Sequence, residues 1–253
     1  MTKRAFKRMV REGGSDEARH DDSKIRRLPV DRAWSPLGSN DDARDQGYLK
    51  TIKAKSEGQA EMMAAIDAKN LVMALGPAGT GKTYLAIAKA VEALDAGKVG
   101  RIVLSRPAVE AGESLGYLPG DMEDKLAPYL RPLYDALSDR MTMKRVKFLI
   151  QDGAIEIAPV GYMRGRTLNN AFVVIDEAQN CTYGQLKMLL TRLGWHSTMV
   201  VTGDPNQSDL LPGMSGLADI ADKFEAVNNI AVVRLAEQDI VRHPLVAEML
   251  HVL

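Results

Sequence analysis

Short apolar runs alternate along the chain with longer segments in which apolar residues recur every three or four positions. The runs lie at residues 71–75, 101–105, 171–175 and 198–202, with 154–158 and 230–233 as further strands, and are typical of buried β-structure. Helical spacing covers 58–69, 82–96, 183–193 and about 237–252, and it includes the leucines between 126 and 137, where Pro128 and Pro132 punctuate the pattern. Strands separated by helices of this length predict βαβ units and a mostly parallel sheet flanked by helices.

This alternation begins only after the first 46 residues. Residues 1–46 are poor in apolar side chains and rich in Gly, Ser, Asp and Asn, which predicts a polar, partly disordered arm before a single α/β domain at 47–253. The first eleven residues are strongly basic. Two interpretations of them stay open: a tail that binds nucleic acid, or a solvated tail without a partner.

The composition restricts the class of protein more than its chemistry. Of 253 residues, 45% are hydrophobic and 26% charged, as in an average soluble domain, and 33 basic side chains balance 33 acidic ones. This balance argues against a histone-like protein but allows a local basic groove. The single cysteine, Cys181, excludes an internal disulfide. No apolar run approaches the ~20 residues that span a bilayer, so we expect a soluble, cytoplasmic protein with no membrane partner.

A glycine-rich segment between a predicted strand and a predicted helix is the strongest sign of chemistry. It fits the pattern GxxxxGK[ST] and consists of Gly76, Pro77, Ala78, Gly79, Thr80, Gly81, Lys82 and Thr83. Its glycines let backbone N–H groups close around phosphate oxygens, and the helix N-terminus adds donors and a favourable dipole. We expect Lys82 to reach the β- and γ-phosphates and the Thr83 hydroxyl to be a ligand of Mg²⁺.

Two acids follow the strand predicted at 171–175. In a parallel sheet, Asp176 at the strand tip lies beside the phosphate loop, where we expect it to hold Mg²⁺ through water. Glu177 is placed to act as general base for an attacking water. A pair of acids at this position favours hydrolysis over simple phosphate handling.

A third polar segment, residues 202–207, follows the strand predicted at 198–202. The Gln207 amide is a candidate contact of the γ-phosphate that responds when this phosphate leaves. Ordinary turn chemistry explains Gly-Asp-Pro-Asn equally well.

Together these segments resemble a known family. Residues 76–83, 176–179 and 203–207 look like the Walker A, Walker B and third motifs of superfamily 1 helicases, and the runs 105–120, 161–168 and 239–243 are similar to the PhoH family of P-loop ATPases. The resemblance extends from about residue 50 to 253. It implies a RecA-like P-loop NTPase fold and ATP hydrolysis with Mg²⁺, and the helicase likeness implies action on single-stranded RNA or DNA, with RNA favoured.

The same resemblance gives roles to further residues. It places an adenine-reading amide at Gln59, although Ser56-Glu-Gly-Gln59 is also a capping-box pattern, and both interpretations stay open. It places an arginine finger at Arg242 and a contact to the strand backbone at Arg106. Arg164 and Arg166, on a glycine-rich loop, are candidates for a groove that tracks phosphates, against the alternative of a solvated basic face.

These expectations define a first hypothesis and a competitor. The first is an ATPase stimulated by nucleic acid; the alternative is an ATP-gated regulatory module that acts through a protein partner. No NKxD segment is present, which argues against guanine specificity. Helicases of this class use two RecA-like domains, whereas about 200 residues suffice for one. We therefore expect a homo-oligomeric ring, by family analogy a hexamer, in which Arg242 completes a neighbour's site.

Overall fold

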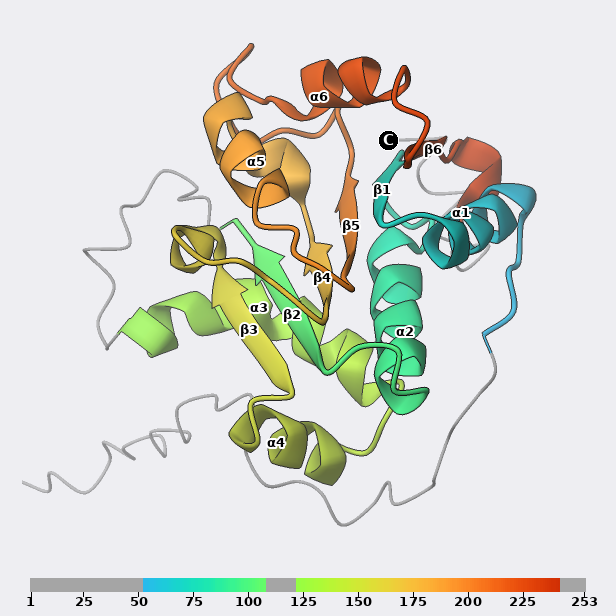
Figure 1. Ribbon diagram of the computed structural model, residues 1–253. Helices are drawn as coiled ribbons and strands as arrows, with labels where there is room; N and C mark the ends of the chain where they lie inside the picture. The colour runs from blue at the N-terminus through green and yellow to red at the C-terminus, as the bar shows by residue number, and fades with distance from the viewer. Residues whose placement is uncertain (1–51, 108–121, 242–253) are drawn as a thin grey trace, which may run out of the picture. The chain divides into compact units, whose positions relative to one another are not determined.

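A computed structural model describes residues 52–107 and 122–241 of the chain (Figure 1). The predicted arm at 1–46 and the candidate finger Arg242 lie outside these residues. The boundary at residue 46 therefore remains a prediction. No helix in the described ranges is long and apolar enough to cross a bilayer.

Six parallel strands form one sheet in the order β3-β2-β4-β5-β1-β6. They are β1 (Leu71–Leu75), β2 (Arg101–Arg106), β3 (Ile155–Pro159), β4 (Ala171–Ile175), β5 (Thr198–Gly203) and β6 (Ile230–Arg234). The helices are α1 (Glu57–Ala68), α2 (Lys82–Asp95), α3 (Met122–Ser138), α4 (Met143–Gln151), α5 (Tyr183–Leu190) and α6 (Leu217–Phe224). All carboxyl ends of the strands meet at one edge. Strand β5 lies between β1, which precedes the glycine-rich loop, and β4, which is followed by Asp176.

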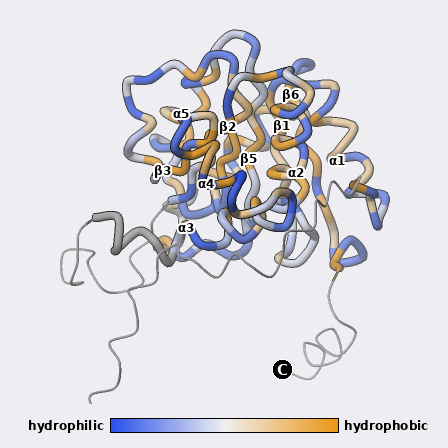
Figure 2. Tube along the Cα trace, turned by 90° about the horizontal axis from the view of Figure 1, so that it is seen from below, coloured by the Kyte–Doolittle hydropathy of each residue, from blue (hydrophilic) through white to orange (hydrophobic). Residues whose placement is uncertain are grey.

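Two hydrophobic cores lie on opposite faces of the sheet, because side chains alternate along each strand. Val72 and Ala74 of β1 face the core shared with α1, α2, α3 and α4. Leu71, Met73 and Leu75 face the core shared with α5 and α6. Figure 2 shows the resulting pattern, with hydrophobic positions gathered along the strands and hydrophilic ones on the outer turns. The result is a three-layer, RecA-like α/β fold.

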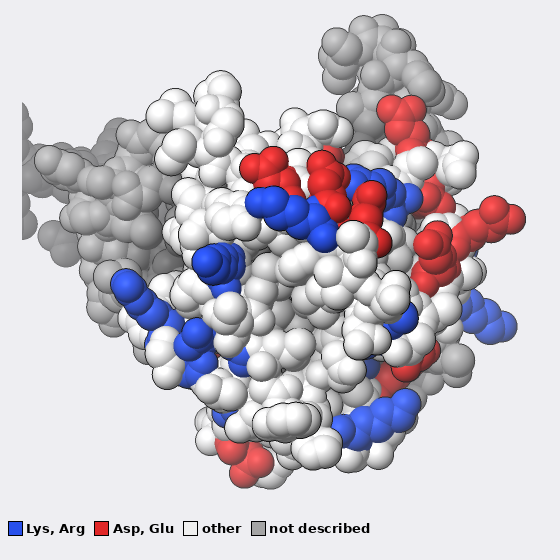
Figure 3. Space-filling model, turned by 45° about the horizontal axis from the view of Figure 1, so that its top comes forward, with Lys and Arg blue, Asp and Glu red and all other residues white. Residues whose placement is uncertain are grey.

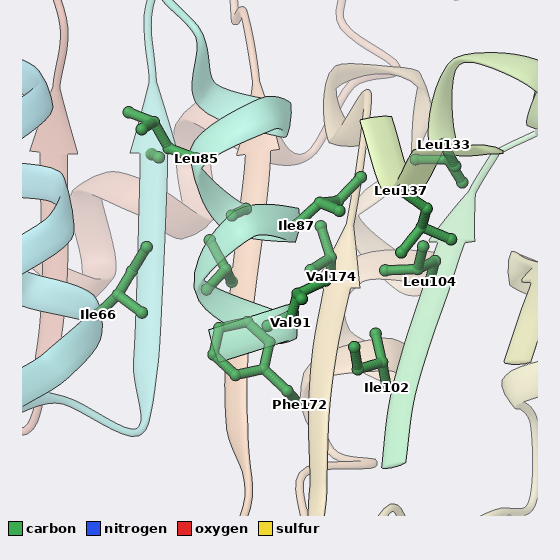
Figure 4. Close-up of a cluster of buried hydrophobic side chains, with 14 of the residues drawn as sticks. Ile66, Leu85, Ile87, Val91, Ile102, Leu104, Leu133, Leu137, Phe172 and Val174 are labelled. Carbon is green, nitrogen blue, oxygen red and sulfur yellow. The ribbon is translucent and has the colours of Figure 1, made fainter. Parts of the chain in front are cut away.

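Helix α2 connects the sheet to the outer helices. It begins after Gly81, whose φ of 83° lies in the left-handed region that glycine adopts most easily. It ends shortly before Gly97, whose φ is 64°. Figure 4 shows Ile87 and Val91 of α2 beside Val174 of β4, and Leu133 of α3 belongs to the same hydrophobic core. This packing fixes the first turn of α2, and with it Lys82 and Thr83, against the sheet.

Most predicted elements are confirmed to within two or three residues, and four differ from the prediction. Helix α3 runs through Pro128 and Pro132 without a break, and neither α4 nor α6 was predicted from the sequence. The helix expected from about 237 is wrong at its start, because residues Glu237–Asp239 form a single 3₁₀ turn and Ile240 is extended. The carboxylate of Asp239 explains this stop. It accepts hydrogen bonds from the N–H groups of Ala236 and Gly58, which ties the turn to α1 instead of continuing a helix.

Candidate active site

The glycine-rich loop between β1 and α2 has a backbone that side chains would obstruct. Gly76, Gly79 and Gly81 have φ angles of 142°, 87° and 83°. A Cβ on Gly76 would collide with the carbonyl of Leu235, which closes the loop from the β6 side. The loop is also tied to β5, since the Gly76 N–H donates to the carbonyl of Gly203 at 3.1 Å. Phosphate-binding backbone is thus held rigidly at the carboxyl edge of the sheet.

Lys82 lies inside this loop. Its ammonium donates to the carbonyls of Gly76 and Pro77 at 2.6 and 2.8 Å, and only 9% of the residue is exposed. Burial lowers the pKa of Lys82, while the negative charges of Asp204, Glu177 and Asp176 oppose that shift. The three carboxylates therefore offset part of the cost of burying the cation.

Asp176 connects the loop helix to the sheet. Its Oδ1 accepts hydrogen bonds from the hydroxyls of Thr83 and Thr202 at 2.6 and 2.8 Å, and its own N–H donates to the carbonyl of Ser105. The side chain is buried. A hydroxyl and a carboxylate at hydrogen-bond distance are hard oxygen ligands, so Thr83 and Asp176 fit a Mg²⁺ ion that also takes ligands from phosphate and water.

Glu177 projects from an unusual backbone position. Its φ of 52° is left-handed, a conformation that non-glycine residues adopt rarely and mostly at functional sites. Gln179 donates to its Oε2 at 2.5 Å, and Arg106 donates to its Oε1 at 3.4 Å. Gln179, itself buried, accepts a hydrogen bond from the N–H of Asp204. No role was predicted for Gln179 from the sequence, although it stands in the run resembling Walker B.

These groups enclose a cavity of about 280 Å³ between the loop and the tips of β4 and β5. Its walls include Lys82, Thr83, Asp176, Glu177 and Gln207. Gln207 is exposed, and its N–H donates to the carbonyl of Asp204, the residue that also contacts Gln179. The residues expected from three separate sequence segments to handle phosphate therefore meet around one cavity.

Gln59 is buried next to the loop instead of facing the cavity. Its amide N–H donates to the carbonyl of Thr80 at 3.0 Å, and its side-chain oxygen accepts from the N–H of Lys55. Ser56 caps α1 by accepting the Gln59 N–H, so half of the capping-box interpretation is confirmed. The reciprocal half is shifted by one residue, to Lys55. Both ends of the Gln59 amide are thus used within the protein.

The three arginines expected at a nucleic-acid surface differ in their surroundings. Arg164 is exposed. Arg166 donates from both terminal nitrogens to Glu156 at 2.5 and 2.6 Å, which lowers the pKa of Glu156, and Arg106 pairs with Asp176 and Glu177. A contact of Arg106 or Arg166 with nucleic acid would require exchange of these partners. On the face in Figure 3, basic side chains form separate groups, not a continuous stripe.

Two further groups complete the survey of reactive residues. Cys181 is buried, and desolvation raises the pKa of its thiol to about 12, as expected for a packed and unreactive residue. Within residues 52–107 and 122–241, no cluster of three or more His, Cys, Asp or Glu side chains could hold a metal by itself. A Mg²⁺ ion at Thr83 and Asp176 would therefore need phosphate and water as further ligands.

The chain has extensive similarity to known proteins. The family model described as PhoH-like protein matches residues 51–253. A PhoH-like protein of Bacillus subtilis is 54% identical over 202 residues, which cover 79% of this chain and 63% of that relative. Protein PhoH of Escherichia coli K12 is 41% identical over 252 residues, covering 98% of this chain and 70% of the relative.

Coverage and structural similarity are more limited. The chain spans 63% of the Bacillus relative and 57% of a Mycobacterium tuberculosis PhoH-like protein that is 56% identical. Among solved structures, the large terminase of a thermophilic bacteriophage is 12% identical, with a TM-score of 0.48 over 78% of this chain and 49% of the terminase. The family match over residues 51–253, with relatives at 41–56% identity, shows that the chain belongs to the PhoH family.

Proposed function

We propose that the chain binds and hydrolyses ATP with Mg²⁺ and couples this reaction to single-stranded nucleic acid, preferring RNA to DNA. The observation that carries the proposal is the 2.6 Å hydrogen bond between Thr83 and Asp176. It joins the first turn of the phosphate-loop helix to the tip of β4, with Glu177 one residue further on. A loop that only binds phosphate needs the first turn of this helix, but it does not need the two acids Asp176 and Glu177.

The chain's own residues have separate tasks in hydrolysis. Backbone N–H groups of residues 79–83 and the Lys82 ammonium hold the phosphates and stabilise charge that develops on the γ-phosphoryl group. Glu177 orients a water and accepts its proton as the water oxygen bonds to phosphorus and the bond to the ADP oxygen breaks. Mg²⁺ bound near Thr83 and Asp176 supplies further neutralisation of phosphate charge. Gln207, on the cavity wall, is placed to respond when the γ-phosphate leaves.

The base preference, the nucleic-acid partner and the oligomeric state are further parts of the proposed function. The preference for adenine and the choice of nucleic acid as partner come from the family resemblance. Among the residues that the structure describes, exposed Arg164 is the candidate for a contact with a phosphodiester group. A homo-oligomeric ring, in which a neighbouring subunit completes the ATP cleft, comes from the same resemblance.

Two substitutions test the hydrolytic site. Lys82→Ala should abolish nucleotide binding or turnover, since the phosphates lose their cation in a desolvated loop. Glu177→Gln keeps the size of the side chain, so it should retain ATP binding while turnover falls by roughly 10²–10⁴, the usual contribution of a general base. Near-normal turnover in the Glu177→Gln protein would remove Glu177 from its assigned role.

The coupling to nucleic acid needs its own experiment. ATPase rates of the wild type are measured alone, with single-stranded RNA and with single-stranded DNA of matched length. Stimulation that is stronger with RNA supports the proposal. Equal rates in all three conditions would favour an ATP-gated regulatory module that acts through a protein partner.

A further inference from the structure

Arg106 occupies a position in the site that the sequence did not indicate. Strand β2 pairs with β4 in a register that sets Ser105 opposite Ile175, so Arg106, the last residue of β2, lies beside Asp176, which follows β4. The guanidinium lies 3.3 Å from Asp176 Oδ2 and 3.4 Å from Glu177 Oε1. Arg106 is not part of the cavity wall, which Asp176 and Glu177 form. It therefore contacts the acid pair without lining the space for phosphate.

The contact with Glu177 has a consequence for the attacking water. Both carboxylate oxygens of Glu177 accept hydrogen bonds, Oε1 from Arg106 and Oε2 from Gln179. Each oxygen keeps a second lone pair for a water, but a carboxylate held at both oxygens is restrained in its orientation, so it turns toward a water in the cavity more readily once one donor is released.

Of the two donors, Arg106 is the one that can be released. Gln179 is buried, its contact measures 2.5 Å, and its other end accepts the N–H of Asp204. A Cβ on Gly203 would lie 2.7 Å from the Gln179 side-chain oxygen, so this amide is tightly enclosed. The Arg106 side chain is 22% exposed and its contacts exceed 3.2 Å, a geometry in which ion pairs are weak.

A second arginine shows what a tight pair looks like in this fold. Arg166 binds both oxygens of Glu156 at 2.5 and 2.6 Å in a two-pronged arrangement. Arg106 instead divides its two nitrogens between two carboxylates at longer distances. Asp176 has additional support, because two threonine hydroxyls hold its other oxygen. Loss of Arg106 should thus free Glu177 more than Asp176.

We propose that Arg106 is a positioning residue that restrains Glu177 and keeps the basal hydrolysis rate low. This inference rests on the proposed ATPase function and concerns its regulation. Any event that draws the guanidinium away from Glu177 accelerates hydrolysis without changing how tightly the nucleotide binds.

The test compares Arg106→Gln with the wild type in steady-state ATP hydrolysis without nucleic acid. The basal kcat should rise about two- to fivefold, the range that release of a weak, part-exposed ion pair allows, while KM and the affinity for a fluorescent ATP analogue stay the same. Arg106→Lys should lie between the two, because a single ammonium can hold one carboxylate but not bridge both. Melting temperatures establish that each variant is folded, and Arg106→Lys keeps a cation in the site should Arg106→Gln unfold.

Two further proteins make the outcome specific. Arg234→Gln removes another arginine that bridges two acids, Asp222 and Glu225, at the far edge of the sheet, and it should leave kcat unchanged. The double variant Arg106→Gln/Glu177→Gln should be as inactive as Glu177→Gln alone, because the gain acts through Glu177. A kcat that falls or stays constant in both Arg106 variants overturns the inference alone. Absence of hydrolysis in the wild type and in both Arg106 variants overturns the ATPase proposal as well.

Discussion

The side-chain amide of Gln59 donates a hydrogen bond to the carbonyl of Thr80 across 3.0 Å, linking the first turn of α1 to the phosphate loop. Its oxygen accepts the N–H of Lys55, and 4% of the residue is exposed. Gln59 also sits 3.2 Å from the Cβ position of Gly81, so the loop passes close beside it. This glutamine therefore supports the phosphate loop through the carbonyl of Thr80.

The buried contact predicts how nucleotide selectivity responds to substitution. Gln59→Ala leaves the Thr80 carbonyl and the Lys55 N–H without their partner, at a cost of about 1–3 kcal/mol, part of which falls on the bound loop. Affinity for ATP and for GTP should therefore decrease by the same factor, up to about tenfold, in a fluorescence competition assay. Gln59→Glu, which keeps the acceptor for Lys55 but loses the donor to Thr80, isolates the loop contact. A loss confined to ATP would instead identify Gln59 as an adenine-reading residue.

The sequence predicts the fold well where signals are local and repeated. Short apolar or alternating runs mark all six strands, because each is packed into a parallel sheet and carries little else. The glycine-rich loop follows from its residue spacing. Helices α4 and α6 were not predicted, since nine- and eight-residue helices offer barely two turns of periodicity.

The sequence predicts the residues that line the cavity but not the residues that hold them in place. Loop glycines, Lys82 and the two acids at the tip of β4 are adjacent in sequence to the strands that position them. The roles of Arg106 and Asp239 depend on partners 70 or more residues away, through the β2–β4 register and the packing of the last turn on α1. Pairings at such separations leave no periodic trace in a single sequence. Both residues nevertheless stand inside the runs that resemble the PhoH family.

Asp239 predicts a pH-dependent link between the end of β6 and α1. Its pKa is lowered by hydrogen bonds from Ser56 and from the N–H groups of Ala236 and Gly58. Because the folded-state pKa lies below the unfolded value near 3.9, the carboxylate stabilises the fold above that pH and ceases to do so as pH falls below it. Asp239→Asn should lower Tm at pH 7 by about 2–6 °C.

The difference in Tm between Asp239→Asn and the wild type should shrink as pH decreases toward 3, measured by circular dichroism in matched buffers. Gly58→Ala is an independent disruption of the same contact, since its Cβ would lie 2.5 Å from an Asp239 oxygen. A constant difference between pH 7 and 3 would mean that the carboxylate charge is not what stabilises the turn.

Arg164 and Arg166 should behave differently toward a single strand of RNA. Arg164 is exposed, so Arg164→Ala should lower the slope of log affinity against log salt by about 0.7, the effect of one phosphate contact on a single strand. Arg166 is bound to both oxygens of Glu156, so Arg166→Ala should leave the slope unchanged and reduce stability. Fluorescence anisotropy over a salt series measures both slopes, with ATP affinity as the control that should not change. An unchanged slope in both variants would assign this loop to the solvated surface.

The described chain ends beside its own phosphate loop, because the N–H of Val241 donates to the carbonyl of Gly79 at 3.0 Å. Arg242 is the next residue. The family resemblance assigns it as a finger, and in a ring that finger would serve a neighbouring subunit. Residue 241 contacts the phosphate loop of its own chain. The alternative is therefore that Arg242 acts on the nucleotide bound by its own subunit.

Mixing two inactive subunits separates these alternatives. Arg242→Ala has an intact phosphate loop, and Lys82→Ala has an intact Arg242. An arginine at the developing γ-phosphate charge contributes ~10³ or more to the rate, so each protein alone should hydrolyse ATP very slowly. In a ring, a Lys82→Ala subunit supplies its finger to an Arg242→Ala neighbour. The mixture should then regain activity in proportion to the number of these mixed subunit pairs. The regained rate should fall on dilution as the ring dissociates, monitored by light scattering under the same conditions. A mixture no faster than the sum of its parts, or a wild type fully active as a monomer during turnover, would place the finger in the same subunit as the loop it serves.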